Sequence, residues 1–453
     1  MKKIKVIFVV SILMLIIVPI IFFNHEKNVA SSLDNRMLTE LDDYSLDNVE
    51  NYISDRIGFR KEMISIYNKI NRDLFDVITS QDLMVGSDGK NLYPKISSIE
   101  EFNNYHQKFL DSVKEIQNYC ESRGIGFYFV FEPSKSSIIK DTLPEGLNYS
   151  NDWIDDFVNI AKEMNINIVD NYTYFNLIKD EESLYNISYD TYHWNDNGAF
   201  LGINNLLNEI GNDYPNVSTN NIEDYDLVVK EKDEDGNDID DQVYEYIPKN
   251  KAKDLTEKYF DGLDLYEDFS DFYYFDSNDD VPSILSFQGS YLMMEDRTEK
   301  FLANNFSKTV AIHNYQNIFN INYYLNIFRP DIVVFEVADY TFAEYYFAQY
   351  FMETMFLPPT LDKFDEYKIN DNCEKLDYIK DINGEYVTYI FDNKGNKYEY
   401  GYLIIDDEIY DLRKYDNENM ALTILKENDF DIEKITIKYI NEEDNSVNIY
   451  GLK

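Results

Sequence analysis

The run Phe127-Tyr128-Phe129-Val130-Phe131, closed by Glu132-Pro133, decides the fold class of this chain. An unbroken apolar run of this length predicts a β-strand that is buried on both faces. Before it, the apolar positions of residues 102–119 fall on one helical stripe, and Gly124 is a suitable stop for that helix. A helix followed by a doubly buried strand is the repeating unit of a parallel sheet.

The same alternation continues along the chain. Further helices are predicted at 153–164, 199–210, 298–306 and 315–327, and further strands at 166–169, 284–287, 309–312 and 332–337. We therefore predict an α/β fold with a parallel, flavodoxin-like sheet and helices on both faces. This core domain covers residues 81–345, and an acidic insertion at about 220–282 interrupts its rhythm.

Two further segments have a different pattern. Apolar residues at helical spacing between 46 and 74 predict an amphipathic helix within a membrane-proximal helical segment, residues 24–80. The Asp88-Gly89 turn between two short apolar pieces predicts a hairpin over 85–93. Short strands at 386–391, 402–405 and 435–439, separated by turn signals, predict a small β-rich domain over 346–453.

The first 23 residues predict a transmembrane signal anchor. Three lysines at positions 2, 3 and 5 precede the run from Val6 to Phe23, which only Ser11 and Pro19 interrupt. Such a run is just long enough to cross a bilayer as a helix, and the lysines favour the inside. We expect a single-pass protein of the cell membrane with everything after residue 23 outside. A cleaved signal peptide ending near Val29-Ala30-Ser31 is the alternative.

Charge excludes some partners. The net charge is −44, which argues against nucleic acid because phosphate contacts need clustered Lys and Arg. Seven acidic residues between 231 and 241 fit a solvated loop better than a calcium loop, since Gln242 stands where a bidentate Glu belongs. The two cysteines have no metal-type spacing. We expect no metal and no cofactor.

Three residues can carry nucleophilic acyl chemistry. Ser290 follows an apolar strand and Gly289, the placement that exposes a nucleophile at the edge of an α/β sheet. Asp190 and His193 are close enough in sequence for one loop to carry both. A serine attacks, a histidine takes its proton and an aspartate orients the histidine. The alternative is an ordinary loop in which Asn195 or Asn197 opens a helix.

The surroundings of these residues suggest further roles. Trp194 is expected to pack beneath the histidine, and the backbone N–H groups of Gly289 and Ser290 are candidate donors to an oxyanion. Gln288 and Tyr291, on either side of Gly289-Ser290, are included with Gly289 and Trp194 as candidate oxyanion or substrate-binding residues.

Several segments in order resemble the SGNH-hydrolase-like family that includes the alginate O-acetyltransferases AlgJ and AlgX and the related DHHW proteins. The resemblance covers roughly residues 48–340. Its segments are Asp55-Arg56-Ile57-Gly58-Phe59-Arg60, Val85-Gly86-Ser87-Asp88-Gly89 with Leu92-Tyr93, Pro133-Ser134-Lys135, Tyr185, Asp190 to Trp194 with Gly198-Ala199, Gly289-Ser290, and Arg329 to Glu336.

The resemblance implies an SGNH-like core with Ser290 as nucleophile, His193 as general base and acid, and an aspartate as orienter. The chain departs from the family in two places. The family usually has that aspartate two residues before the histidine, where this chain has Thr191, whereas Asp190 stands three residues before His193. The family also favours Gly-Asp-Ser where this chain has Gln288-Gly289-Ser290. Glu336 matches a commonly acidic position without an assigned role.

The function expected is an extracytoplasmic O-acyltransferase that acetylates a cell-surface polysaccharide or wall polymer through a covalent acyl-serine. The resemblance also implies a partner of the membrane-bound O-acyltransferase type that supplies acyl groups. Two alternatives stay open. One is a carbohydrate esterase or deacetylase that uses the same residues, and the other is a catalytically degenerate glycan-binding surface protein.

Overall fold

The computed structural model describes a large part of the chain. The described residues are 8, 13–14, 17–25, 30–31, 36–41, 44–60, 62–63, 66, 83–94, 99, 101–143, 150–187, 190–232, 238–265, 270–277, 280–343, 346–347, 352–353, 355–371, 374–395 and 397–453. They form two compact units, residues 1–84 and 85–453. Each unit is described by itself.

The first unit holds a short strand pair, β1 (Ala30–Ser31) and β2 (Arg36–Met37), and the helix α2 (Leu46–Arg56). The helix expected over 46–74 is present over 46–56 and is interrupted where the backbone turns extended at Ile57, while residues 67–74 lie outside the described residues. A side chain at Gly58 would collide with the Phe22 backbone, so this bend is tightly packed.

Within the expected anchor, residues 6–23, positions 6–7, 9–12 and 15–16 lie outside the described residues. Among the residues that are described, no helix is both long and apolar enough to cross a membrane.

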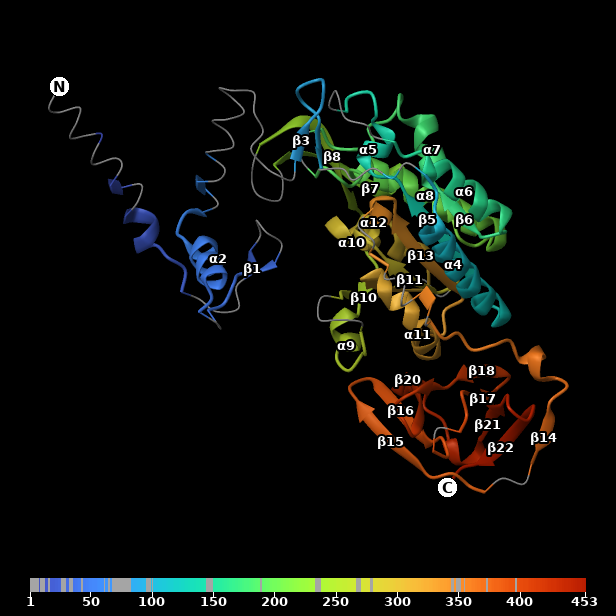
Figure 1. Ribbon diagram of the computed structural model, residues 1–453. Coiled ribbons are helices and arrows are strands. Elements are labelled where there is room, and N and C mark those ends of the chain that lie inside the picture. Colours follow the sequence, from blue (N-terminus) through green and yellow to red (C-terminus); the bar gives the residue numbers. More distant parts are fainter. Residues whose placement is uncertain are drawn as a thin grey trace. The chain divides into compact units, whose positions relative to one another are not determined.

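The second unit is built on a seven-stranded sheet with the order β6-β5-β13-β11-β12-β10-β9 (Figure 1). Its first five strands run parallel: β6 (Ile168–Asp170), β5 (Gly126–Glu132), β13 (Ile332–Ala338), β11 (Ile284–Gln288) and β12 (Lys308–His313). Every residue of β11 and β13 is buried, as their largely apolar sequences predict.

The sheet is mixed: the expected parallel strands form its larger part, and two antiparallel strands that were not expected extend it. The strands β10 (Phe272–Asp276) and β9 (Lys253–Asp254) continue it in antiparallel order beyond β12. Both belong to the segment expected to be an insertion. The same segment forms the separate hairpin β7 (Tyr225–Lys232) and β8 (Asp238–Pro248) and the short helix α9 (Thr256–Phe260).

Alternating side chains of β5 lead to different helices. Phe129 and Phe131 contact aromatic rings of α4 (Asn104–Ser122) and α6 (Trp153–Glu163). Tyr128 instead donates a hydrogen bond to Asp213 of α8 (Asp196–Asp213), and Glu132 accepts one from Asn171 of α7 (Asn171–Ile178). Because successive side chains of a strand point to opposite faces, helices cover both faces of the sheet.

The expected hairpin over 85–93 is present as β3 (Leu83–Val85) and β4 (Leu92–Pro94). Asp88 Oδ1 accepts the backbone N–H groups of Lys90 and Asn91 in its turn.

Residues 368–451 form two further sheets around their own apolar core (Figure 1). One sheet has the order β14-β22-β21-β17-β18 and the other β15-β16-β20-β19. The strands are β14 (Lys368–Asn370), β15 (Tyr378–Asn383), β16 (Tyr386–Asp392), β17 (Tyr400–Ile405), β18 (Glu408–Asp411), β19 (Arg413–Lys414), β20 (Asn419–Leu425), β21 (Thr436–Asn441) and β22 (Ser446–Gly451).

A buried ion pair joins these sheets to the helices of the large sheet. Asp411 Oδ1 lies 2.8 Å from Arg123 at the end of α4. Asp411 also accepts the hydroxyl protons of Tyr119 and Tyr400. Both ions are buried, so this charge pair is satisfied on several sides, as a buried ion must be.

Candidate active site

Ser290 stands at the carboxyl end of β11, where the strand turns into the short helix α10 (Ser290–Met293). The carboxyl ends of parallel strands are where open α/β sheets bind ligands. Gly289 is needed at the turn because a Cβ there would overlap the Tyr315 ring. The strand-to-turn position inferred from the sequence is therefore the position that Ser290 occupies.

Asp190 and His193 come from the loop before α8. Asp190 has a φ of +39°, in the left-handed region that aspartate tolerates better than most residues. Its Oδ1 accepts the backbone N–H of His193 at 3.2 Å and lies 2.7 Å from Nδ1 of the same residue. The three-residue spacing thus closes a tight turn that brings carboxylate and imidazole together.

The three residues converge. His193 Nε2 lies 2.8 Å from Ser290 Oγ, and Asp190 stands on the other side of the ring. The side chains of His193 and Asp190 are 12% and 17% exposed, so the pair is shielded from water without being closed off. Burial by itself would raise the pKa of Asp190, but His193, with a smaller effect from Arg297, lowers it to about 2. Asp190 is therefore a carboxylate at neutral pH.

Tyr340, at the start of α12 (Tyr340–Ala343), completes the contacts of the nucleophile. Its hydroxyl lies 2.8 Å from Ser290 Oγ. Burial raises the pKa of Tyr340 well above its usual value, so the phenol keeps its proton. Sequence reasoning missed Tyr340 because one tyrosine among 40 carries no signal of its own.

These contacts fix the direction of each proton. The Asp190 carboxylate can only accept, so the neutral His193 ring carries its proton on Nδ1 and accepts at Nε2. Ser290 then donates to Nε2, and its oxygen is left to accept from Tyr340. The serine proton thus already points at the base that has to remove it.

The oxyanion role expected for the Gly289 N–H does not fit the geometry. That N–H donates to Glu336 Oε2 at 2.6 Å. Glu336 is fully buried on β13, and burial raises its pKa to about 8. The acidic position left without a role in the sequence therefore holds the backbone just before the nucleophile.

The other expected substrate-binding residues pack the interior. Gln288 is fully buried and accepts a hydrogen bond from Thr298. The Trp194 indole N–H donates to the backbone carbonyl of Tyr291, and the Tyr291 hydroxyl donates to the carbonyl of Tyr192. Trp194 and Tyr291 are fully buried as well. We therefore assign these three side chains to the support of the site and not to contact with a substrate.

Two buried cations hold the loops of the site. Arg297 donates to the carbonyl of Trp194 at 2.9 Å, and thereby ties the segment after Ser290 to the histidine loop. Lys135 Nζ donates to the carbonyls of Leu92, Asn186 and Ile187. Lys135 therefore joins the end of β5, the β3–β4 hairpin and the segment that leads to Asp190.

The alternative interpretation of this loop also holds in one respect. Asn195 is the N-cap of α8, where its side chain accepts the N–H of Gly198. Capping by Asn195 and contact between His193 and Ser290 are compatible, because neighbouring residues of the loop serve the two purposes.

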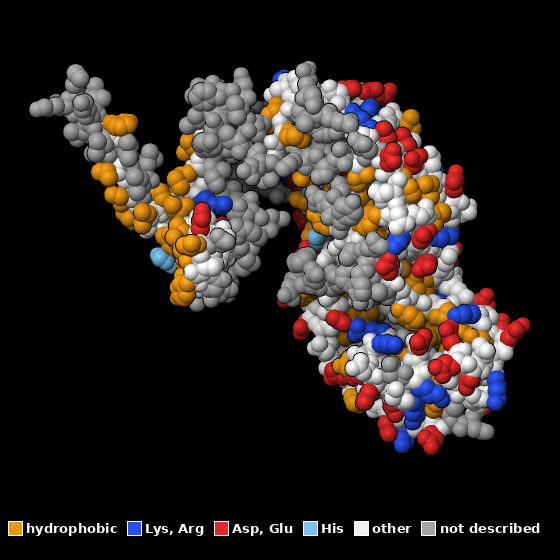
Figure 2. Space-filling view, viewed as in Figure 1, with side chains coloured by type: hydrophobic (Ala, Val, Ile, Leu, Met, Phe, Trp, Pro, Cys, Tyr) orange, Lys and Arg blue, Asp and Glu red, His pale blue; other side chains and the backbone are white. Residues whose placement is uncertain are grey.

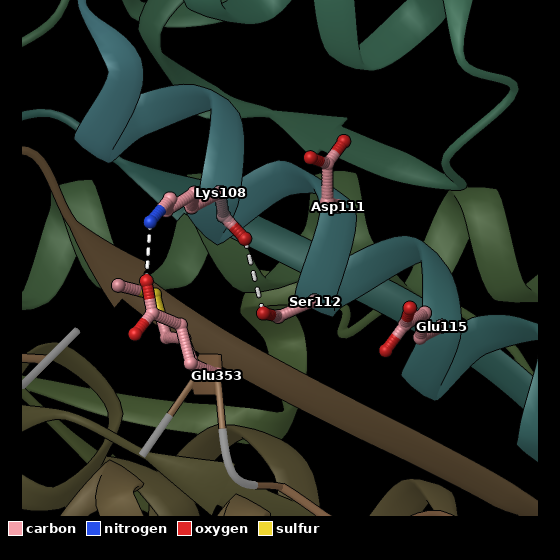
Figure 3. A pocket seen from close by; sticks show the side chains of 6 residues that line it. Lys108, Asp111, Ser112, Glu115 and Glu353 are labelled. Atoms are coloured by element: carbon pink, nitrogen blue, oxygen red, sulfur yellow. Dashed lines mark hydrogen bonds and ion pairs between the residues drawn. The ribbon is translucent and has the colours of Figure 1, made fainter. Parts of the chain in front are cut away.

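A separate hollow of about 140 Å³ lies beside α4 (Figure 3). Its lining shares no residue with the loops of the triad, and its single lysine, Lys108, pairs with Glu353. Within the described ranges, no three His, Cys, Asp or Glu side chains are grouped so that they could hold a metal ion.

Several solved structures resemble the chain. PatB1 from Bacillus cereus, with a sulfonyl adduct, is 17% identical with a TM-score of 0.42, over 57% of this chain and 97% of that one. The O-acetyltransferase domain of AlgJ from Pseudomonas putida is 14% identical with a TM-score of 0.39, over 60% and 98%. A DHHW family protein from Eubacterium siraeum is 14% identical with a TM-score of 0.42, over 62% and 98%.

These neighbours include the kinds of protein that the sequence motifs resemble. No family model matches the sequence, and no curated protein matches it.

Proposed function

We propose that this protein is a membrane-anchored, extracytoplasmic O-acyltransferase that acetylates a hydroxyl of a cell-surface polysaccharide through an acyl-serine. The observation that supports the proposal best is the 2.8 Å contact between Ser290 Oγ and His193 Nε2, with Asp190 on the far side of the ring. A nucleophile, a base and an orienter in this order are the recurring arrangement of covalent acyl transfer.

In the first step Ser290 Oγ attacks the carbonyl carbon of the acyl donor while His193 Nε2 takes the serine proton. The bond between the acyl carbon and the leaving group breaks, and the leaving group receives that proton from His193. In the second step a sugar hydroxyl attacks the acyl-serine and gives its proton to His193. The acyl–serine bond breaks, and the proton returns to Ser290 Oγ.

Tyr340 has a role in both steps. Its O–H donates to Ser290 Oγ in the resting site, next to the point where the acyl carbonyl must arrive. The raised pKa of Tyr340 keeps that proton in place at neutral pH. We propose that Tyr340 stabilises the charge that develops around Oγ and the carbonyl oxygen, as donors fixed in advance do.

The membrane part of the proposal rests on the sequence of residues 1–23. The lysines inside and the following apolar run would place the triad outside the membrane. The donor would come from a membrane-bound O-acyltransferase, as the family resemblance implies.

The test uses purified full-length protein, an aryl acetate donor and a glycan acceptor. Wild type should acetylate the glycan, and Ser290→Ala should lose the reaction. Ser54→Ala, which removes an exposed hydroxyl on α2, is the matched control and should be unchanged. Free acetate without acetyl-glycan would favour an esterase, and glycan binding without any acyl chemistry would favour a non-catalytic protein. Equal activity of wild type and Ser290→Ala would refute the proposal.

A further inference from the structure

A row of tyrosine rings leads away from the nucleophile. Tyr340, whose hydroxyl contacts Ser290, stands edge-to-face with Tyr192 at a centroid distance of 5.5 Å. The Tyr346 ring also stands edge-to-face with Tyr340, at a centroid distance of 6.3 Å. Tyr192 and Tyr340 are half-buried, and Tyr346 is 42% exposed. Three partly accessible aromatic rings therefore form a row that starts next to Ser290 Oγ, the atom that would carry the acyl group.

Among the described residues, the cations around the triad are already engaged. Four basic side chains of this part of the chain contact the loops of the triad or their charged neighbours, and each is bound to acceptors of the protein itself. Lys135 binds the three carbonyls named above, Arg297 binds Trp194 O, Lys230 binds Glu295, and Lys300 binds Asp196. None of these four is available to a carboxylate of a substrate without losing those contacts.

The net charge of the chain also argues against an anionic substrate. The chain has a net charge of −44, and acidic side chains are spread over the described face in Figure 2. The negative electrostatic potential of such a surface repels a polyanion and has little effect on a neutral polysaccharide. At physiological salt this repulsion extends over a Debye length of about 8 Å.

We infer that the Tyr192–Tyr340–Tyr346 row is a subsite for an uncharged pyranose ring, and that the acyl acceptor is a neutral glycan and not a polyuronate. The apolar C–H face of a sugar packs on an aromatic ring. A ring that occupies this row places one hydroxyl next to the acyl-serine. The inference rests on the proposed function, whose acceptor it specifies.

The test measures binding of soluble oligosaccharides to the full-length protein without any acyl donor, by calorimetry. A neutral glucose oligomer should bind more tightly than a uronate oligomer of equal length, and the difference should shrink as salt is added. Tyr346→Ala should weaken binding of the neutral oligomer about tenfold, the loss expected for one aromatic contact. Tyr346→Trp should restore it. Tyr415→Ala removes a tyrosine that is 51% exposed on the β-rich part, and serves as the matched control.

Tighter binding of the uronate, or equal binding by wild type and Tyr346→Ala, would overturn the inference. Acetylation of Ser290 by an aryl acetate, measured on the wild type, is independent of this result. If Ser290 is acetylated but the binding pattern is absent, the proposed function is supported and the subsite is refuted. If the binding pattern is present but Ser290 is not acetylated, the subsite is supported and the proposed function is refuted.

Discussion

Replacing Asp190 by asparagine tests the electrostatic part of the site. The carboxylate accepts from His193 Nδ1 at 2.7 Å, and its pKa falls from 3.8 to about 2. That fall of nearly two pKa units corresponds to about 2 kcal/mol of net interaction in favour of the charged carboxylate. Asparagine loses this interaction. If its amide nitrogen faces Nδ1, the amide donates a hydrogen bond to Nδ1 and selects the other His193 tautomer. In that tautomer Nε2 carries the proton and cannot accept a hydrogen bond from Ser290.

The two losses have separate sizes. Loss of charge alone should slow acylation by about one to two orders of magnitude, whereas a wrong tautomer should bring the total to about 10³–10⁴. The assay is the rate of aryl alcohol release from an aryl acetate, with Thr191→Val as the neighbouring control. Stability gives a second measurement. A lowered carboxyl pKa stabilises the fold above pH 4, and the contribution is lost as pH falls through about 2. Asp190→Asn should lack this loss. An activity within threefold of wild type would refute the assignment of Asp190.

Three further predictions concern the surroundings of Ser290. Tyr340→Phe removes the hydroxyl at 2.8 Å and should slow acylation about tenfold or more, in the same aryl acetate assay, while the fold melts at an unchanged temperature. Gly289→Ala brings a Cβ against the Tyr315 ring and should cost about 1–3 kcal/mol in urea unfolding, whereas Gly451→Ala, with its nearest neighbour at 3.8 Å, should cost much less. The raised pKa of Glu336 means that the neutral acid stabilises the fold below pH 4.5, and that this contribution is lost as pH rises through about 8. Melting temperatures of Glu336→Gln should lack that decline, and an equal decline in both proteins would contradict the buried acid.

The parallel core of the sheet could be predicted from the sequence because its strands are buried on both faces. The run at 127–131 is unbroken and apolar for that reason, and the runs at 284–287 and 332–337 are each interrupted by a single polar residue, Ser286 and Glu336. Strand β10 was not predicted because it lies in a stretch next to acidic residues, with its neighbours far away in sequence. Antiparallel pairing with β12 depends on tertiary contacts that no local pattern encodes.

The three residues of the triad could be predicted from the sequence for a chemical reason. Asp190 and His193 are neighbours in sequence, and a serine just after a buried strand has few uses other than exposure at a sheet edge. The roles of Tyr340 and Glu336 could not be predicted from the sequence because they depend on the topology of the sheet. Both residues come from β13 and the turn after it, and β13 becomes the neighbour of β11 only through the parallel crossover. Sequence spacing gives no sign that residues 290 and 340 meet.

The central claim is that Ser290 carries the acyl group, and rapid-quench peptide mass spectrometry tests it most directly. Full-length protein is mixed with an aryl acetate, quenched at short times and digested. We predict an acetyl group on Ser290 in the wild type, no acetylation of that peptide in Ser290→Ala, and strongly slowed acetylation in His193→Ala. An acetyl group on another residue, or equal rates of Ser290 acetylation with and without His193, would contradict the account.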